Sequence, residues 1–442
     1  MKRRVDLIVH SARQLLTLGE AEVSSTLSIS PSRPRQGEAM NELGLIEDGA
    51  VAVSHGFITL AGTTKEVLAQ TEADEMIDAS NRVVMPGFVD PHTHLVFAGS
   101  REDEFESRIR GATYMEIMAA GGGIMSTVRA TRAATLPQLI AQGRERLDRM
   151  LAHGTTTAEA KSGYGLNVDD ELKMLEAIRQ LDATHPVDLV PTFLGAHAVP
   201  VEFKGRADEY VEMVVNEMLP LAERKLRGDA SDALAPSVPF FCDVFCEEGA
   251  FSVSQSRRIL ERARELGFGL KVHADEFKPL GGTRLAVKLG AVSADHLVCT
   301  TVEEIEALAG SDTIAVSLPG TPFGLGHHEY TPARQIVEAG GALALASDLN
   351  PGTCYCESMQ FIIALACRYM HLTPGEAITA ATLNAAHAVG LGHKVGSLET
   401  GKKADIIVLD IPNYRHLGYH FGVNLVERVV KSGQVLPRNS GQ

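Results

Sequence analysis

The segment "VVMPGFVDPHTH", residues 83–94, is hydrophobic until its last residues, where His92 and His94 stand one residue apart. Polar side chains are costly to bury unless each has a partner, so their position at the end of an apolar run needs a reason. Side chains at positions i and i+2 of a strand point to the same side. The two imidazoles should therefore converge on one point, as the ligands of a single metal ion do.

Three further candidate ligands stand at the ends of other apolar runs: His273 in "GFGLKVH", His296 in "AVSADH" and Asp348 in "ALALASD". Taken singly, a histidine at a strand end is usually structural, and Asp348 can cap a turn or a helix. Three imidazoles from this set and the carboxylate suit one zinc or ferrous ion that keeps a position open for water. Such an ion lowers the pKa of its water towards about 7. The pattern predicts a hydrolytic metal centre.

These candidate ligands need a scaffold that brings strand ends together. Eight apolar runs alternate with helical segments such as "SQSRRILERARELG". This alternation predicts an α/β fold with a closed (β/α)8 TIM-like barrel, in which the carboxyl ends of all strands face one pocket. An open doubly wound sheet is less favoured, because no GxGxxG motif follows the first run. The runs end near His94, Lys161, Gly195, Cys246, His273, His296, Leu318 and Asp348.

The two ends of the chain have a different character from its middle. Residues 1–80 and 395–442 are rich in short β-type runs, and neither segment looks large enough for a core of its own. We therefore expect one small composite β-sandwich domain built from both termini, and a barrel over residues 81–394. A polar stretch at residues 17–42, rich in Ser, Pro and Glu, lacks the apolar surface needed to order itself. We expect it to be a mobile surface loop that catalysis does not require.

Composition and charge exclude several classes of partner. The chain of 442 residues carries 41 Lys and Arg against 56 Asp and Glu, a net charge of −15, and no basic run suited to phosphates. Nucleic acid and anionic membranes are therefore not expected as partners. No segment approaches the roughly 18 apolar residues of a membrane span, and Asp6 and His10 interrupt the basic N-terminus where a signal peptide would be apolar. We expect a cytoplasmic protein.

The six cysteines are sparse for a chain of this length and lack the spacing of a disulfide scaffold. Cys242 and Cys246 have a spacing conceivable for half of a zinc knuckle. No second Cys/His pair at finger spacing follows them, however. Free thiols are the favoured interpretation.

The motifs resemble a known family. "PGFVDPHTH", "HADE" and "SDLNPGT" occur in this order, followed by "ADIIVLD" near the end, as in the amidohydrolase superfamily. More closely, "HTHLVFAGSREDEF", "AKSGYGL", "FLGAHAVP", "VHADEF" and "ADHL" are similar to the imidazolonepropionase family. The resemblance covers nearly the whole chain and departs only at the polar stretch of residues 17–42. It implies hydrolysis of 4-imidazolone-5-propanoate, a small-molecule substrate, to N-formimidoyl-L-glutamate in histidine degradation.

The resemblance also implies roles for particular residues. The family's metal ligands match His92, His94, His273 and Asp348, which would hold one divalent or trivalent ion per chain. Zinc and iron share this ligand set, so both stay open, and we expect a homodimer. The family's substrate contacts match Arg101, Tyr164, His197, Glu276 and Thr353, and its product contacts match Tyr164, Asn350 and Gly352.

The chemistry of these residue types agrees with that assignment. The substrate carries a propanoate, and the guanidinium of Arg101 suits a carboxylate. Glu276 stands three residues beyond a ligand, so it can reach the pocket without binding the metal, to hold a ring nitrogen or to pass a proton to the leaving nitrogen. His296 can orient or deprotonate water, while the ion held in part by Asp348 stabilises the oxyanion. Either Glu276 or His296 can be the general base.

Three alternatives remain. A mononuclear deaminase acting on a cytosine- or guanine-like ring would also use "HADE", but a neutral base gives it no need for Arg101 with Tyr164. A binuclear centre is disfavoured, because the fourth run ends in "FCEEGAF" without the bridging lysine that such centres generally use. A metal-free barrel that serves only as a binding module is disfavoured, because every expected ligand is present.

Overall fold

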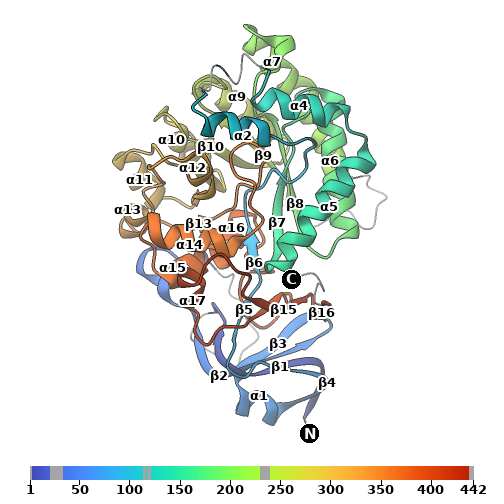
Figure 1. The fold of residues 1–442 in the computed structure, drawn as a ribbon, viewed down its shortest axis with the longest axis vertical. Helices are drawn as coiled ribbons and strands as arrows, with labels where there is room; N and C mark the ends of the chain where they lie inside the picture. The colour runs from blue at the N-terminus through green and yellow to red at the C-terminus, as the bar shows by residue number, and fades with distance from the viewer. Residues whose placement is uncertain (1, 20–32, 113–115, 117–120, 229–238, 438–442) are drawn as a thin grey trace.

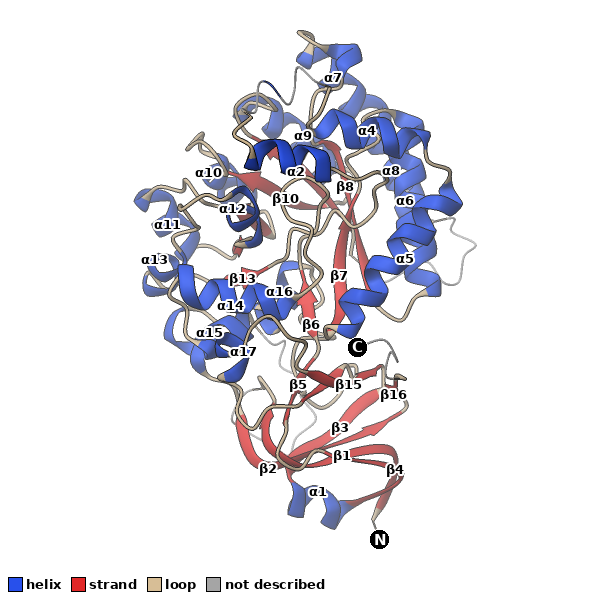
Figure 2. Ribbon diagram, viewed as in Figure 1, coloured by secondary structure: helices blue, strands red, loops and turns tan. Residues whose placement is uncertain are grey.

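The computed structural model of the chain describes residues 2–19, 33–112, 116, 121–228 and 239–437. Its strands form two sheets of eight strands each. One sheet belongs to a barrel wrapped by helices, and the other lies beside it and is built from both ends of the chain (Figure 1). Figure 2 shows that helices dominate the first part and strands the second. The predicted α/β barrel with a terminal β unit is confirmed.

The barrel strands are parallel and follow one another in sequence order. The first and last strands approach through a bridge between Thr93 and Leu349, where the His94 amide donates to the Leu349 carbonyl at 2.9 Å. All eight predicted runs contain a strand. These are β6 (Phe88–Asp90), β7 (Thr155–Lys161), β8 (Asp188–Ala196), β9 (Phe241–Cys246), β10 (Gly269–Ala274), β11 (Ser293–His296), β12 (Ile314–Ser317) and β13 (Leu343–Leu345).

The helices follow the strands and cover the outside of the barrel. In α9, for example, Ser252 caps the first turn with its hydroxyl, and Ile259 and Leu260 are buried against the strands. The helices are α2 (Glu102–Ile109), α4 (Ile124–Ala133), α5 (Leu136–Ala152), α6 (Val168–Thr184), α7 (Ala207–Met213), α8 (Leu219–Arg227), α9 (Val253–Glu265), α10 (Gly282–Leu289), α11 (Val302–Ala309), α12 (Gly320–Leu325), α13 (Ala333–Glu338), α14 (Met359–Tyr369), α15 (Pro374–Ala380), α16 (Leu383–Ala388) and α17 (His416–Tyr419). Short 3-10 turns at Val201–Phe203 and Gly37–Asn41 and a π-helical turn at Val214–Met218 complete the set.

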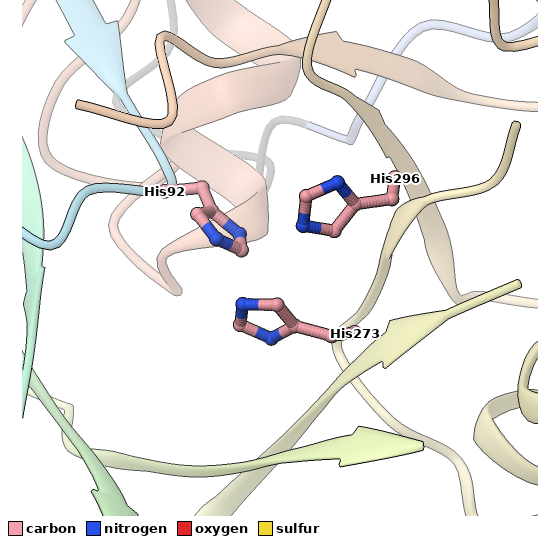
Figure 3. Close-up of side chains that lie close together, drawn as sticks. All are labelled: His92, His273 and His296. Carbon is pink, nitrogen blue, oxygen red and sulfur yellow. The ribbon is translucent and has the colours of Figure 1, made fainter. Parts of the chain in front are cut away.

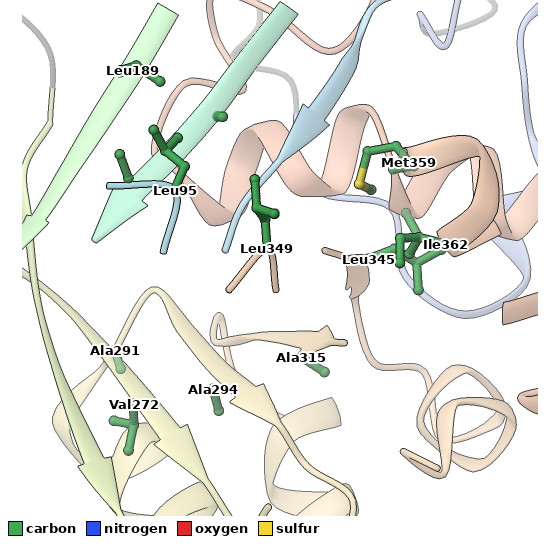
Figure 4. Packing of buried hydrophobic residues seen from close by; sticks show 14 of the residues in the cluster. Leu95, Leu189, Val272, Ala291, Ala294, Ala315, Leu345, Leu349, Met359 and Ile362 are labelled. Carbon is green, nitrogen blue, oxygen red and sulfur yellow. The ribbon is translucent and has the colours of Figure 1, made fainter. Parts of the chain in front are cut away.

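Alternation along the strands separates an apolar layer from a polar interior. Val272 belongs to the largest hydrophobic cluster, part of which Figure 4 shows together with Met359 and Ile362 of α14. The residues on either side of Val272, Lys271 and His273, contact charged groups of other strands inside the barrel: Glu159 of β7 and Asp243 of β9. Because side chains of a strand alternate between faces, one face of β10 builds the core and the other faces the functional site.

The second sheet combines both termini. Its strands are β1 (Arg3–Leu16), β2 (Leu45–Ser54), β3 (Phe57–Thr63), β4 (Thr71–Asp78), β5 (Val83–Pro86), β14 (Ile406–Leu409), β15 (Val426–Lys431) and β16 (Gln434–Val435), with α1 (Thr64–Gln70) after β3. Strand β5 pairs with both β1 and β14, so the segment of residues 83–94, expected as one strand, divides into β5 here and β6 in the barrel. We propose that residues 1–80 and 395–442 form one domain, to which β5 adds a strand.

The polar stretch of residues 17–42 only partly matches its prediction. Residues 20–32 lie outside the described residues. Beyond them, Met40 is fully buried, and its carbonyl accepts a hydrogen bond from the Thr379 hydroxyl at 2.7 Å. The backbone of Arg35 exchanges two hydrogen bonds with the Asn384 side chain, at 2.8 and 2.9 Å. The prediction of a mobile loop is therefore wrong for residues 35–41, because α15 and α16 supply the partners that the segment lacks on its own.

Two further observations bear on the sequence predictions. No helix in the described part of the chain is long and apolar enough to cross a membrane. All six cysteines are free, and Cys242 and Cys246 are buried on β9.

Candidate active site

The predicted metal ligands meet at the carboxyl end of the barrel. His92 and His94 follow β6, His273 lies on β10, and Asp348 follows β13. The Nε2 atoms of His92 and His94 each lie 3.6 Å from Oδ1 of Asp348. The ring centroids of His92 and His273 are 4.5 Å apart. The four candidate ligands lie up to two hundred and fifty-six positions apart in sequence. The β/α topology brings them together, because the carboxyl ends of all barrel strands converge on one rim.

His296, at the end of β11, joins the same cluster. Its ring centroid lies 5.4 Å from that of His92 and 5.1 Å from that of His273, and Figure 3 shows the three imidazoles facing one another. Ligand atoms of these three histidines all lie within 4.8 Å of one another, and the same holds for His92, His94 and Asp348. His296 therefore lies close enough to act on anything bound to the predicted ligands.

The donor set fits a metal ion. Among the described residues, Nε2 of His92, Nδ1 of His94 and both ring nitrogens of His273 are buried and have no hydrogen-bond partner, although Nδ1 of His273 lies 2.8 Å from Oδ2 of Asp243. Unpartnered buried nitrogens are costly, and a metal ion bound at Nε2 of His92 and Nε2 of His273 would remove that cost for these two atoms. Burial lowers the pKa of His92, His94 and His296 well below the ordinary value, so these imidazoles are neutral, as metal ligands must be.

Asp348 supplies the carboxylate of the set. Burial raises the pKa of Asp348 to about 6, against the opposing hydrogen bond from the Thr321 hydroxyl. The backbone of Asp348 has φ of +54°, and that of His296 has φ of +77°, in the left-handed region that non-glycine residues rarely adopt. Such conformations persist where the surrounding structure enforces them, often at functional sites.

Beneath the ligands lies a set of buried charges that the sequence analysis did not single out. Asp295 accepts from Nδ1 of His92 at 2.6 Å, and Oδ2 of Asp243 lies 2.8 Å from Nδ1 of His273. Lys161 lies 2.8 Å from the same Asp243 oxygen. The signal for these residues was present, because charged side chains recur at two-residue spacing inside apolar runs such as "TTTAEAK" and "GLKVH".

Glu276 lies beside His296, with its Oε1 3.6 Å from Nδ1 of His296. Burial, with the nearby charges of Asp348 and Glu247, raises the pKa of Glu276 well above its ordinary value. Asp275 fixes the turn that follows, because its Oδ1 accepts from the Gly281 amide at 3.0 Å and its Oδ2 from the Thr283 amide at 2.9 Å. Its surroundings therefore favour the neutral form of the Glu276 carboxyl.

Tyr164 and His197 extend the site on the side of His94. The rings of His94 and His197 stack with centroids 4.9 Å apart, and Tyr164 lies 5.3 Å from His197. Burial lowers the pKa of His197 to about 3, and its Nδ1 lies 3.0 Å from the Gly163 carbonyl. Gly163 has φ of +111°, and a Cβ there would meet Nδ1 of His197 at 3.0 Å, so only glycine fits this turn.

Arg101 lies directly against the loop that follows Asp348. A Cβ on Gly352 would fall 2.1 Å from Nη1 of Arg101, so the absence of a side chain lets the guanidinium approach. Nε and Nη2 of Arg101 donate to Glu104 at 2.9 and 2.7 Å, and Arg108 donates to the Gly352 carbonyl at 3.1 Å. A cavity of about 480 Å³ beside them is lined in part by Arg101, Arg108, Gly352 and Thr353.

Asn350 organises this loop. Its Oδ1 accepts from the amides of Gly352 and Thr353, both at 2.8 Å, and its Nδ2 donates to the Asp348 carbonyl at 2.8 Å. These bonds tie the predicted contact residues to the predicted metal ligand. The structure thus gathers the candidate ligands at the carboxyl end of the barrel and places Arg101 against the loop that follows Asp348. It also assigns to the Asn350 side chain a structural task that the sequence did not reveal.

The comparisons with known proteins agree with this geometry. Residues 83–436 match the model of the amidohydrolase family. The imidazolonepropionase of Herpetosiphon aurantiacus is 54% identical over 93% of this chain and 96% of its own, and that of Symbiobacterium thermophilum is 49% identical over 98% of each. An adenosine deaminase from Xanthomonas campestris with bound zinc (TM-score 0.67, 20% identity, 98% of this chain and 93% of that one) and E. coli guanine deaminase (TM-score 0.70, 14% identity, 97% and 98%) share the fold. The chain therefore belongs to the amidohydrolase family and, within it, to the imidazolonepropionases.

Proposed function

We propose that the protein hydrolyses 4-imidazolone-5-propanoate to N-formimidoyl-L-glutamate. The observation that carries the proposal is a set of candidate metal ligands at the carboxyl end of the barrel, with Glu276 beside His296 and with the guanidinium of Arg101 against the loop that follows Asp348. The relatives named imidazolonepropionase support it, because they align over nearly the whole chain. In this reaction the water oxygen adds to the ring carbonyl carbon, the adjacent C–N bond breaks, and the ring nitrogen takes up a proton.

We further propose that His92, His94, His273 and Asp348 hold one ion of zinc or iron. When bound, such an ion polarises the carbonyl and lowers the pKa of water. The neutral imidazoles and the unpartnered nitrogens of His92 and His273 support this ligand set. Metal analysis of the purified protein tests it, and two ions per chain, or full activity without any, would contradict it.

The roles of the two candidate acid-base residues follow from their charge states. Burial favours the neutral form of His296, which can accept the proton that the attacking water loses. Burial also favours the protonated form of Glu276, which can donate to the departing ring nitrogen. Two groups whose environments drive their pKa values apart are suited to opposite tasks. We therefore assign His296 as the base and Glu276 as the acid.

Substrate orientation would depend on Arg101 and its neighbours. The guanidinium can receive the propanoate, while Tyr164 and His197 flank the side of the ring near His94. Glu104 occupies two donors of Arg101, so the substrate carboxylate would bind at Nη1 or compete with Glu104. Thr353, Asn350 and Gly352 would complete this end of the pocket.

The decisive experiment follows the loss of the imidazolone's ultraviolet absorbance with the purified protein. In parallel, ammonia release from cytosine and guanine tests the alternative deaminase reaction, which the fold likeness to guanine deaminase leaves as the second candidate. Consumption of the imidazolone without ammonia release supports the proposal. Ammonia release from either base, with the imidazolone untouched, would overturn it.

We also propose that the protein acts as a homodimer and without a nucleic-acid or membrane partner. The net charge of −15 disfavours binding to polyanions. Sedimentation of the purified protein measures the number of subunits, and a monomer at assay concentration would contradict the first part of this proposal.

A further inference from the structure

Five charged side chains fill the barrel interior below the predicted metal ligands. Each is fully buried, at 0% exposure. They come from four different strands, and two are cations and three are carboxylates: Glu159, Lys161, Asp243, Lys271 and Asp295. Buried charges are costly unless they are paired, so this cluster has to be explained by what it holds.

Lys161 lies within ion-pair distance of all three carboxylates of the cluster. Its Nζ lies 2.8 Å from Oε2 of Glu159, 2.8 Å from Oδ2 of Asp243 and 3.9 Å from Oδ2 of Asp295. Lys271 contacts Glu159 at 3.1 Å and donates to the Pro91 carbonyl at 2.8 Å. Lys161 is thus the cation within ion-pair distance of both aspartates.

The two aspartates use the same oxygen atoms to contact the metal ligands. Oδ2 of Asp243 lies 2.8 Å from Nδ1 of His273, and Oδ2 of Asp295 lies 2.6 Å from Nδ1 of His92. Each of these oxygens therefore faces Lys161 on one side and a ligand imidazole on the other. With Nδ1 of each ring turned to a carboxylate, Nε2 is left to face the metal position.

Three carboxylates and two lysines leave one negative charge in the cluster, which a cation at the ligands would offset. Other groups hold the Oδ1 atom of each aspartate: the amides of Val244 and His273 donate to Asp243, and the Ser293 hydroxyl donates to Asp295. The Oδ2 atoms, which face the imidazoles, are the ones that Lys161 contacts. Without Lys161, Oδ2 of Asp243 would lose its partner cation, and the charges of the two aspartates would be less well compensated.

We propose that Lys161 is a positioning residue of the metal site, which holds Asp243 and Asp295 where they orient the imidazoles of His273 and His92. Lys161 touches neither the metal position nor the substrate. Its effect passes through two carboxylates to two of the four ligands. This inference rests on the metal site proposed above.

The test measures the affinity for zinc rather than activity. The metal-free protein is titrated with Zn²⁺ in competition with a chromophoric chelator, and thermal unfolding is recorded for each variant. We expect Lys161→Met to weaken zinc binding by about 10- to 100-fold, the usual cost of removing a group that supports a metal ligand from behind. The absorption bands of the Co²⁺-loaded protein should also change, because they report the geometry of the ligands.

Lys431→Met is the matched control. Lys431 is also buried, and it also lies between two carboxylates, Asp188 and Asp405, each at 2.7 Å. It belongs to β15 of the terminal sheet, away from the ligands. Its replacement should lower thermal stability as that of Lys161 does, but leave the zinc affinity and the Co²⁺ spectrum as in the wild type.

A second variant keeps the proposal testable if Lys161→Met does not fold. Lys161→Met combined with Asp243→Asn removes one charge of each sign and retains the shape of the aspartate. We expect this double variant to fold and still bind zinc more weakly than the wild type. Wild-type zinc affinity in either folded variant would overturn the inference. Failure of the wild type to bind zinc tightly would instead overturn the proposed metal site.

Discussion

The carboxyl group of Glu276 and the imidazole of His296 face each other in the pocket, with Oε1 of Glu276 lying 3.6 Å from Nδ1 of His296. Burial acts on both groups, but it raises the pKa of Glu276 well above its ordinary value and lowers that of His296 well below. One environment thus produces an acid and a neutral base side by side, because burial always disfavours the charged form.

Replacing Glu276 by Gln should lower kcat/KM by about 10²- to 10⁴-fold, the usual contribution of a general acid. Only the protonated carboxyl can donate, so the wild-type rate should fall as the pH rises through the raised pKa of Glu276. The Gln variant should lose this alkaline limb. Profiles of kcat/KM against pH for the metal-loaded proteins measure the effect, and an unchanged limb in the variant would assign it to another group.

His94→Ala should remove both the metal and the activity, because Nε2 of His94 lies 3.6 Å from the Asp348 carboxylate in the predicted ligand set. Elemental analysis of the purified variant, together with the absorbance assay, provides the measurement. His153→Ala is the control, since His153 ends α5 at the opposite end of the barrel. If the His94 variant retained its metal and normal turnover, the pocket would be misplaced.

Arg101→Lys should retain the metal but lower kcat/KM, since lysine keeps the charge and loses the guanidinium fork. A charge-assisted hydrogen bond contributes roughly 1.5–3 kcal/mol, which corresponds to about a ten- to hundred-fold loss. Arg101→Ala should cost at least as much. Whether Arg101 binds the propanoate is tested with a substrate whose carboxylate is replaced by a carboxamide.

With that carboxamide substrate, the wild type should discriminate strongly and the Arg101→Ala variant hardly at all. Equal discrimination by both proteins would show that Arg101 does not contact the propanoate. It would leave the Arg101–Glu104 pair as a purely structural feature of the pocket mouth.

The buried histidines should contribute less to the stability of the metal-free protein as the pH falls below about 6.5, the ordinary pKa of histidine. Burial lowers the pKa of His197 to about 3, and it lowers those of His92, His94 and His296 in the same direction. Between these values these histidines bind more protons in the unfolded chain than in the folded one, so their contribution to stability rises with pH. Buried carboxyls such as Asp348, whose pKa is raised to about 6, act in the opposite direction, so the contribution of a histidine is measured by comparing a variant with the wild type.

Thermal unfolding of the metal-free protein at several pH values measures this loss. His197→Gln should make the dependence shallower, because it removes one of the titrating groups that lie outside the predicted ligand set. The same pH dependence of the melting temperature in the wild type and in the His197→Gln variant would contradict the neutral state of His197 in the folded protein.

Met40→Ala should destabilise the protein by about 2–5 kcal/mol, the usual cost of truncating a buried methionine. Met40 is fully buried where residues 37–41 pack near the amino-terminal end of β13, opposite the catalytic pocket. The value of kcat/KM should therefore stay close to that of the wild type. Glu38→Ala, an exposed neighbour on the same turn, is the control in a denaturant titration, and equal stability of both variants would restore the mobile-loop interpretation for this segment.

The sequence alone was enough to predict the barrel, and it named the candidate metal ligands that the structure brings together. Both depend on local patterns: apolar runs of strand length show where strands form, and a polar ligand type at the end of a run shows which residues face the shared pocket. His92, His94, His273, His296 and Asp348 could be named as candidates in this way because a parallel barrel places every strand end on one rim, and the resemblance then selected four of them as ligands. The motif resemblance added the contact residues around them.

Only the tertiary structure decided which charged groups are buried inside the barrel and which of them contact one another. Lys161 contacts Asp243 and Asp295, which lie on two other strands. Each aspartate in turn contacts the imidazole of a candidate ligand. The local spacing of residues in the sequence does not predict these contacts. Met40 is buried for the same kind of reason. Its carbonyl accepts from the hydroxyl of Thr379 in α15, which lies more than three hundred positions later in the chain. Composition describes what a segment can do by itself. Burial and pairing depend on neighbours that are distant in sequence, and only the folded chain brings those neighbours into contact.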